Sequence, residues 1–434
     1  MAESLHGANY NGQIANETVQ RTNCEEVVMR KRLGGIFLTL TMTAGLAAAV
    51  TYALSATDGS NLTVHEWGTF TSIAGPDGQA IEWRPLSGPS DLPCFVTTLN
   101  PNSIKVNAQG GIPGLKALVR METPVLYFYS PDAMTARVSV AFPQGLFSEW
   151  YPQAGVSMAP LANTGQWRWQ INWPNVEITP GAKEEFPTEP GESHYYAARD
   201  TDAAPVTVGK QQEKFLFYRG IASFKPPVTA TIARDGSVSV VQKTGEPIDT
   251  FVLFERRGGR FGYRLVSTDR SDVRVERPVL TGSLESLRQD LRDMLITRGL
   301  YPREAAAMVE TWRDSWFEEG ARLFYVLPQA TVDRLLPLDI DPKPSNLTRV
   351  FVGRMEVVTP EMESEVAAAI RTNDGPVLRK YGRFLEPISE VVRARLATTH
   401  DEAKIGESLM AVVSKPATMC RAATTAATSN PSSQ

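Results

Sequence analysis

The sequence lacks the short motifs by which common enzyme classes are recognised. It has only three cysteines and four histidines in 434 residues. There is no Cys-x-x-Cys pair or Cys/His cluster, which excludes a structural zinc site of that type. The G-x-S-x-G turn, the Walker A loop and the G-x-G-x-x-G fingerprint are all absent. The sequence therefore predicts no cofactor and assigns no metal ligands.

An excess of positive charge is also missing. The chain carries 44 Lys and Arg against 48 Asp and Glu, a formal net charge of −4 at pH 7. Basic and acidic side chains are equal in number over residues 1–57, so the negative charge belongs to the part that follows. Because binding to a phosphate backbone requires a basic surface, we expect no nucleic-acid partner.

One long uncharged run is present near the N-terminus. Residues 33–56 read LGGIFLTLTMTAGLAAAVTYALSA, without a charged side chain. As a helix this run would be about 36 Å long, enough to cross a hydrocarbon layer of about 30 Å. Arg30, Lys31 and Arg32 directly precede it, and basic flanks stay cytoplasmic. We therefore expect the chain from about residue 58 onward to lie outside the inner membrane.

Two main interpretations of this segment, residues 29–57, remain open. A retained signal anchor would leave the protein inner-membrane-anchored and facing the periplasm, and the length of the run favours it. A cleaved signal peptide would leave the protein periplasmic or secreted, and the small residues Ala53 and Ser55 favour a cleavage site. In that case the chain starts at Met29, and residues 1–28 are a polar extension from a misassigned start. A buried helix of a soluble domain is a third interpretation.

The cysteines fall on both sides of this segment. Cys24 precedes it, whereas Cys94 and Cys420 follow it, in a compartment where disulfides can form. Cys94 and Cys420 either form a bridge, which would tie the C-terminal tail to the first domain, or remain two unpaired thiols.

Most of the exported part has the pattern of a β protein. Short runs rich in Thr, Val and aromatic residues alternate with turns that contain Pro and Gly. Trp167, Trp169, Ile171 and Trp173 recur at a strict period of two, on one face of a strand. Such a stripe could stack on sugars, but it is more typical of a sandwich core. We predict a β-sandwich-like domain of many short antiparallel strands over residues 62–280.

The pattern changes at Ser283, which is placed to cap a helix with Leu287 and Leu291 on its apolar face. A further helix is expected after Thr359, where Pro360 can occupy its first position. We predict a separate α+β helical domain over residues 283–413. Residues 414–434 are small and polar, and are expected to form a disordered tail.

The predicted fold class is therefore mainly β and sandwich-like, followed by an α+β C-terminal region and preceded by a membrane or signal helix.

Four phrases of the sequence resemble a group of exported bacterial proteins that have no assigned activity. These phrases are VHEWGTFTS at 64–72, ETPVLYFY at 122–129, EWYP at 149–152 and RVFVGR at 349–354. The resemblance spans roughly residues 63–395 and implies an exported protein. A polar extension like residues 1–28 is unlike that group.

His65 and Glu66 are the first candidates for chemistry. Neighbours on a strand point to opposite faces, so these two side chains cannot bind one metal ion without a bulge. His65 shares a face with Trp67, and Glu66 shares the other with Gly68, where a ligand could approach closely. In the alternative, His65 is a hydrogen-bonded core residue and Glu66 is a strand-edge partner of an arginine.

Glu149 is a second carboxylate in an aromatic setting, beside Trp150 and Tyr151. Apolar neighbours raise the pKa of a carboxylate, as a general acid requires. Glu66 and Glu149 could therefore serve as the carboxylate pair of a glycosidase. In the alternative, Glu149 forms a salt bridge with an arginine.

A third group of candidates surrounds His194. His65, His194 and either Glu149 or Asp200 could form a metal site with two histidines and a carboxylate, although no local spacing supports one. The candidate catalytic residues are Glu66, Glu149 and His194. The candidate ligand-binding residues are His65, Trp67, Trp150, Arg199 and Asp200.

The leading hypothesis is an exported, envelope-associated protein that acts as a binding or structural component. Its expected partners are the membrane, through the N-terminal helix if it is retained, and an envelope glycan or protein. The alternative is a hydrolase of an envelope polymer or glycan, with or without a metal ion. The hydrolase requires Glu66, Glu149 and His194 to converge on one cleft.

Overall fold

The computed structural model describes residues 60–87, 92–99, 115–160, 167–191, 193–243 and 245–396. The predicted polar extension, the signal or anchor helix and the C-terminal tail lie outside the described residues. Within the described ranges, no helix combines the length and hydropathy needed to cross a membrane.

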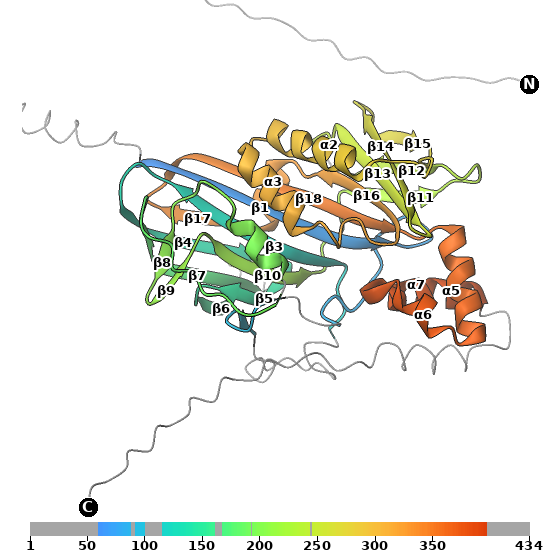
Figure 1. Cartoon of the computed structure of the whole chain (residues 1–434), viewed down its shortest axis with the longest axis horizontal. Coiled ribbons are helices and arrows are strands. Elements are labelled where there is room, and N and C mark those ends of the chain that lie inside the picture. Colours follow the sequence, from blue (N-terminus) through green and yellow to red (C-terminus); the bar gives the residue numbers. More distant parts are fainter. Residues whose placement is uncertain are drawn as a thin grey trace, which may run out of the picture. The chain divides into compact units, whose positions relative to one another are not determined.

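The described part is mainly β and is organised around a nine-stranded sheet (Figure 1) with the order β14-β13-β16-β18-β1-β3-β10-β5-β2. Its strands are β1 (Ser60–Ala74), β2 (Thr97–Thr98), β3 (Val119–Tyr129), β5 (Gly145–Tyr151), β10 (Leu216–Ala222), β13 (Thr250–Arg257), β14 (Arg260–Ser267), β16 (Gly320–Val326) and β18 (Pro344–Val357).

The centre of this sheet is formed by the two longest strands, which come from opposite ends of the described chain. β1 and β18 are parallel, with Glu66 opposite Arg349 and Thr71 opposite Arg354. The other pairs in the sheet are antiparallel. β1 has 15 residues and β18 has 14, so the centre is built from long strands and not from the short ones predicted.

Two smaller sheets pack in one apolar layer against one face of the nine-stranded sheet. One has the order β17-β4-β7-β8-β9 with β6 also paired to β7, and the other has the order β11-β12-β15. Their strands are β4 (Met134–Phe142), β6 (Gly155–Pro160), β7 (Trp167–Ile178), β8 (Val206–Val208), β9 (Gln211–Glu213), β11 (Val228–Ile232), β12 (Val238–Gln242), β15 (Asp272–Val275) and β17 (Leu338–Asp341). Ile171 and Trp173 of β7 are fully buried in this layer, which confirms the core interpretation of the tryptophan stripe at these positions.

Helices cover the other face of the large sheet. These are α2 (Leu284–Thr297), α3 (Pro302–Thr311) and the short 3-10 helix η3 (His194–Arg199), whose apolar side chains share one cluster with β1, β3 and β18. Figure 1 shows α2 and α3 lying over the long central strands. The Ser283 hydroxyl accepts a hydrogen bond from the Ser286 backbone N–H at 3.3 Å, so the predicted cap of α2 is confirmed.

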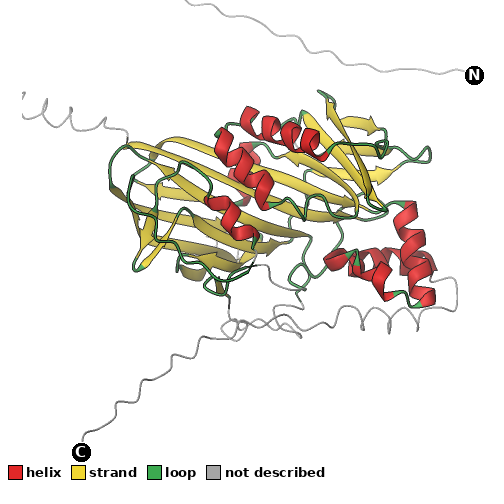
Figure 2. Ribbon diagram, in the orientation of Figure 1, coloured by secondary structure: helices red, strands yellow, loops and turns green. Residues whose placement is uncertain are grey.

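A second group of helices follows β18 (Figure 2). It comprises α5 (Pro360–Thr372), α6 (Gly375–Arg379), the 3-10 helix η4 (Gly382–Phe384) and α7 (Leu385–Leu396), while α4 (Gln329–Leu335) lies earlier, between β16 and β17. Thr359 caps α5 and Pro360 opens it, as predicted. These helices pack around Ile73 of β1 and Trp83.

The boundary predicted between residues 280 and 283 does not separate two domains. β16 and β18 lie in the same sheet as β1 and β13, and the described residues form one compact unit. The reason is that β18 pairs on one side with β16 and on the other side with β1, which is far away in the sequence.

Candidate functional site

His65 and Glu66 mark two different polar centres, because they point to opposite faces of β1. Trp67, two positions after His65, packs under the helices, whereas Val64, two positions before Glu66, packs between the sheets. The predicted division of this strand into two faces is therefore confirmed.

Glu66 lies between the sheets, in a fully buried ion pair. Arg349 donates from Nε to Oε2 of Glu66 at 2.6 Å, and both side chains have 0% exposure. The Tyr218 hydroxyl donates to the other carboxylate oxygen. The predicted arginine partner is confirmed, although Glu66 sits on a central strand and not at an edge of the sheet.

His65 lies on the helical side, beside a second buried carboxylate. Its Nδ1 is 2.8 Å from Oε2 of Glu304, a residue of α3 with 0% exposure. Glu304 also accepts from the Tyr129 hydroxyl at 2.6 Å and from the Tyr301 backbone N–H at 2.8 Å, where it caps the helix. The alternative role of His65, a hydrogen-bonded core residue, is therefore confirmed.

An open cavity of about 340 Å³ lies beside this second centre. Tyr129, Asn61, Thr63 and Asp202 are among its lining residues. Burial raises the pKa of Tyr129 well above its usual range, and the neighbouring Glu304 carboxylate adds to the effect. The Tyr129 hydroxyl therefore stays protonated and serves as a donor to Glu304.

Glu149 belongs to a different face from Glu66. Its neighbour Trp150 packs between the sheets, so Glu149 points to the helical side. There Oε1 lies 3.9 Å from Nη2 of Arg120, and Ser148 donates to Oε2. The alternative role of Glu149, a salt bridge to an arginine, is confirmed.

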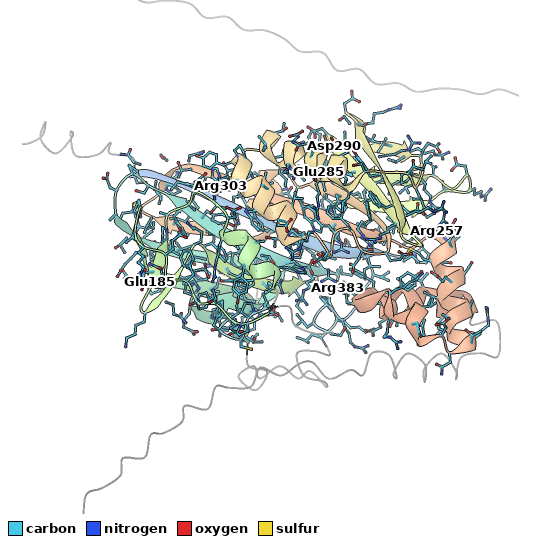
Figure 3. The ribbon with its side chains drawn as sticks, in the orientation of Figure 1. Glu185, Arg257, Glu285, Asp290, Arg303 and Arg383 are labelled. Atoms are coloured by element: carbon cyan, nitrogen blue, oxygen red, sulfur yellow. The ribbon has the colours of Figure 1, made fainter. Side chains whose placement is uncertain are left out.

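His194 opens η3 and contacts neither candidate carboxylate. Its Nε2 is 2.7 Å from Oδ2 of Asp314. Farther along, Arg199 donates to both carboxylate oxygens of Glu213 at 2.9 and 2.6 Å. Asp200 pairs with Arg303, which lies in the first turn of α3 (Figure 3).

The predicted catalytic residues therefore do not converge. Glu66, Glu149 and His194 each contact a separate set of partners, and His65 and His194 bind different carboxylates. Trp67 and Trp150 are buried in two different apolar clusters. No group of three His, Cys, Asp or Glu side chains in the described ranges is arranged to hold a metal ion.

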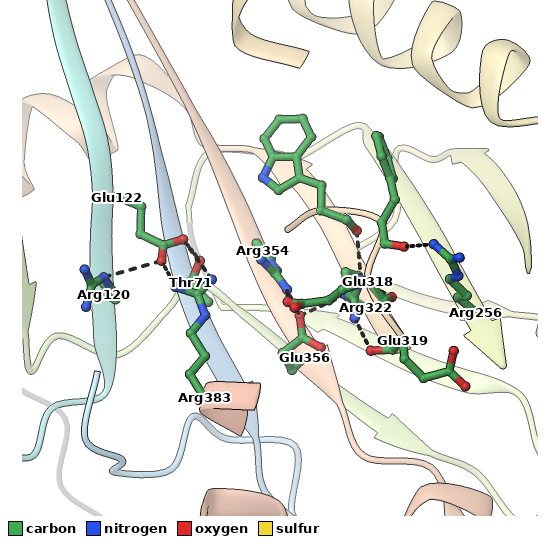
Figure 4. Close-up of polar contacts among 12 residues, drawn as sticks. Thr71, Arg120, Glu122, Arg256, Glu318, Glu319, Arg322, Arg354, Glu356 and Arg383 are labelled. Carbon is green, nitrogen blue, oxygen red and sulfur yellow. Dashed lines mark hydrogen bonds and ion pairs between the residues drawn. The ribbon is translucent and has the colours of Figure 1, made fainter. Parts of the chain in front are cut away.

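Sequence reasoning missed a row of buried charges across the helical face of the nine-stranded sheet (Figure 4). We call this row the charged band. Its members are Arg120 and Glu122 of β3, Arg219 of β10, Arg322 of β16, and Arg354 and Glu356 of β18. All but Arg120 are at most 4% exposed.

One half of the charged band centres on Glu122. Its Oε2 accepts from the Thr71 hydroxyl at 2.7 Å, and Arg383 of η4 pairs with Oε1 from the C-terminal helices (Figure 3, Figure 4). Burial alone would raise the pKa of Glu122. The guanidinium groups of Arg383, Arg120 and Arg354 outweigh burial and lower this pKa to about 2.

The other half centres on Glu356, whose Oε1 accepts from Nε of Arg322 at 2.9 Å and from Nε of Arg354 at 2.8 Å. Arg322 also donates to the backbone carbonyl oxygens of Trp316, Glu318 and Glu319 at 2.7 to 2.8 Å. The chain between α3 and β16 is thus fixed onto the sheet. Nη1 of Arg354 is buried without a hydrogen-bond partner in the described part of the chain.

A strained residue lies between these charges. Thr123 has φ of 47°, a left-handed conformation that is rare for a β-branched residue. Its hydroxyl accepts from Nε and Nη2 of Arg219 at 3.3 and 3.2 Å. The register of β1 against β3 shifts here, opposite Gly68. Backbone strain of this kind is maintained only where surrounding contacts enforce it.

A signal for the charged band was present in the sequence. Glu122 opens the phrase at 122–129, and Arg354 ends the phrase at 349–354. The phrases at 64–72, 122–129, 149–152 and 349–354 fall largely on β1, β3, β5 and β18 of the same sheet. Charged residues inside apolar strands could therefore have been identified as buried.

Cys94 is disulfide-bonded. The other two cysteines, Cys24 and Cys420, lie outside the described residues, so the pairing of Cys94 with Cys420 stays a prediction.

Comparison with known proteins does not place the chain in a family. No protein-family model matches it, and no curated protein matches it. Among solved structures, it is similar to the Fcho1 Mu homology domain of Danio rerio with a bound Eps15 peptide. That likeness has 9% identity, covers 70% of this chain and 100% of that chain, and has a TM-score of 0.27. A TM-score this low carries no argument about fold or function.

Proposed function

We propose that this protein is exported and acts in the bacterial envelope as a binding or structural component, with a sandwich-like fold behind a membrane or signal helix. The export segment at 33–56, led by Arg30, Lys31 and Arg32, supports the location. The resemblance of four phrases to exported bacterial proteins agrees with it.

The geometry of the charged residues supports a non-catalytic role. A glycosidase needs two carboxyl groups that flank one scissile bond. Glu66 and Glu149 instead point to opposite faces of the sheet, and each contacts an arginine. This single observation leaves the paired-carboxylate hydrolase without a geometric basis.

The location is tested by fractionation of native cells together with N-terminal sequencing of the recovered protein. We expect the protein in the membrane or periplasmic fraction. An intact N-terminus at Met1 or Met29 would identify an anchor, whereas a start near residue 57 would identify a cleaved signal peptide. Recovery of the intact chain from the cytosolic fraction would refute export.

The non-catalytic role is tested with purified protein and isolated envelope polymer. We expect no release of soluble fragments above that of a boiled sample. Release that is lost in Glu149→Gln, while the variant keeps its unfolding midpoint, would restore the hydrolase.

A further inference from the structure

A cavity of about 300 Å³ lies between the apolar layer of the sheets and the helices that follow β18. It is bordered by the end of β1, the turn between β11 and β12, the junction of β18 with α5, and α7. In Figure 1 these elements come together at the right-hand end of the large sheet. Ligand pockets start at about 300 Å³, so a cavity of this size suits a small molecule.

Most of the residues that line this cavity are apolar, among them Ala74, Ile232, Val357, Val358 and Val391. Ala74 and Val357 belong to the apolar layer between the sheets, whereas Val358 packs against the cluster of the C-terminal helices. Val391 of α7 is 6% exposed but joins no apolar cluster of the described chain, because its side chain borders the cavity. Apolar side chains around an unfilled space favour a ligand that brings methylene groups into contact with them.

Arg234 supplies the charge that is available in this lining. It is exposed, and its guanidinium group has no hydrogen bond or ion pair with any residue in the described ranges. The other charged residue of the lining, Glu363, already has a partner. A guanidinium group presents its N–H donors in a rigid fork that matches the two oxygens of a carboxylate.

The turn between β11 and β12 fixes the position of Arg234. The Ala233 backbone N–H donates to the Ser237 carbonyl oxygen at 2.8 Å and so closes the turn. The next carboxylate in the sequence, Asp235, accepts from the Ser237 hydroxyl at 2.6 Å and from Nη1 of Arg274 at 2.7 Å. Asp235 is therefore engaged elsewhere and leaves the charge of Arg234 for a ligand.

We propose that this cavity binds a small monocarboxylate with an unbranched hydrocarbon chain. Its carboxylate pairs with Arg234, and its chain lies against Ile232, Val358 and Val391. An ammonium group would find no free carboxylate in this lining, because Glu363 is already partnered. The proposal gives a ligand class to the binding role proposed above and does not depend on export.

The proposal is tested by calorimetric titration of the purified full chain with butyrate, hexanoate and octanoate. The affinity should rise about fourfold for each methylene group that the cavity buries. 1-Hexanol and hexylamine have the same chain length as hexanoate but lack its negative charge. Hexanoate should bind about tenfold more tightly than 1-hexanol, because its carboxylate makes a charged hydrogen bond. Hexylamine should not bind.

Variants of the turn separate the charged contact from the apolar one. Arg234→Gln should weaken hexanoate about tenfold and leave 1-hexanol unchanged, whereas Arg234→Lys, which keeps the charge, should lose less. Ala233→Leu adds apolar atoms to the lining and should weaken octanoate more than butyrate. Arg260→Gln is the matched control, because Arg260 is an exposed arginine beside another hairpin turn and does not line the cavity.

The proposal is overturned if hexanoate binds no more tightly than 1-hexanol, or if Arg234→Gln binds hexanoate as tightly as the control does. Octanoate binding that is unchanged in Ala233→Leu would also overturn it, because the chain would then lie outside this cavity. Both positions lie on a surface turn, so the variants should keep the unfolding midpoint of the wild type. A negative titration would refute this ligand class and leave the result of cell fractionation unchanged.

Discussion

Glu66 and Arg349 lie directly opposite each other in the parallel pair of β1 and β18, and their side chains meet at 2.6 Å with no exposure to solvent. They are 283 positions apart in the sequence. In the sequence, β1 is the first strand of the sheet and β18 is the last. The ion pair joins these two strands at the centre of the sheet.

We expect Glu66→Gln to lower the free energy of unfolding by about 3–5 kcal/mol, because it leaves the Arg349 guanidinium buried without its counter-charge. Urea unfolding at neutral pH measures this. The double variant Glu66→Leu with Arg349→Met should lose less than the sum of the single changes. Glu285→Gln, which breaks an exposed pair with Arg292, is the control and should cost less than about 1 kcal/mol. Equal losses in Glu66→Gln and the control would contradict the structural role of the pair.

Gly68→Ala should destabilise the protein, since the new Cβ would lie 2.8 Å from Cε1 of Phe351 and 3.1 Å from Cα of Pro124. Overpacking of this kind costs about 1–3 kcal/mol. Gly155→Ala is the matched control in β6, because its Cβ would meet only the Asn172 carbonyl oxygen, at 3.8 Å. Thermal unfolding should separate the two variants, and equal midpoints would refute the close approach at Gly68.

Glu122 should make the fold sensitive to acid. Its pKa falls from 4.5 to about 2 on folding, so the unfolded state binds the proton more readily. The stabilisation, about 3 kcal/mol, is complete above pH 4.5 and is lost as the pH falls toward 2. We therefore expect urea unfolding from pH 7 to pH 3 to show a shallower loss of stability in Glu122→Gln than in the wild type.

A second variant supports the same measurement. Arg383→Gln removes a partner of Glu122, and its side chain is 23% exposed, so the fold should tolerate the change. Like Glu122→Gln, this variant should lose less free energy of unfolding than the wild type does between pH 7 and pH 3. Parallel pH profiles for the wild type and both variants would contradict the ion pairs of the charged band.

The disulfide of Cys94 should pair with Cys420, because Cys24 precedes the export segment. Peptide mapping of the native protein without reduction should recover one cross-linked peptide that contains Cys94 and Cys420. A Cys94 peptide linked to Cys24, or to a second molecule, would contradict this pairing and the compartment argument behind it.

Local features of the fold could be predicted from the sequence. The caps Ser283 and Thr359 are local signals, because a hydroxyl before an apolar helix face satisfies backbone N–H groups within one turn. The opposite faces of His65 and Glu66 follow from the period of a strand. The arginine partner of Glu66 was predicted as a residue type but could not be named.

The remaining features depend on contacts between distant segments. In the sequence β18 lies in a region rich in helical patterns, and its pairing with β1 and β16 explains why Arg349, Arg354 and Glu356 are buried. Glu304 could be recognised as a helix-capping residue, but not as the partner of His65. A charged residue is buried only when its counter-charge is supplied, and for Glu66 the counter-charge comes from 283 positions away.

The parallel pairing of β1 with β18 also determines when the molecule can fold. During synthesis β1 leaves the ribosome long before β18. The edge of β1 that pairs with β18 therefore stays without a partner until nearly all of the described chain has been made. Such long-range pairing slows folding and prolongs the exposure of unpaired strand edges. A chain that terminates early would therefore be an aggregation-prone fragment and not a smaller folded protein.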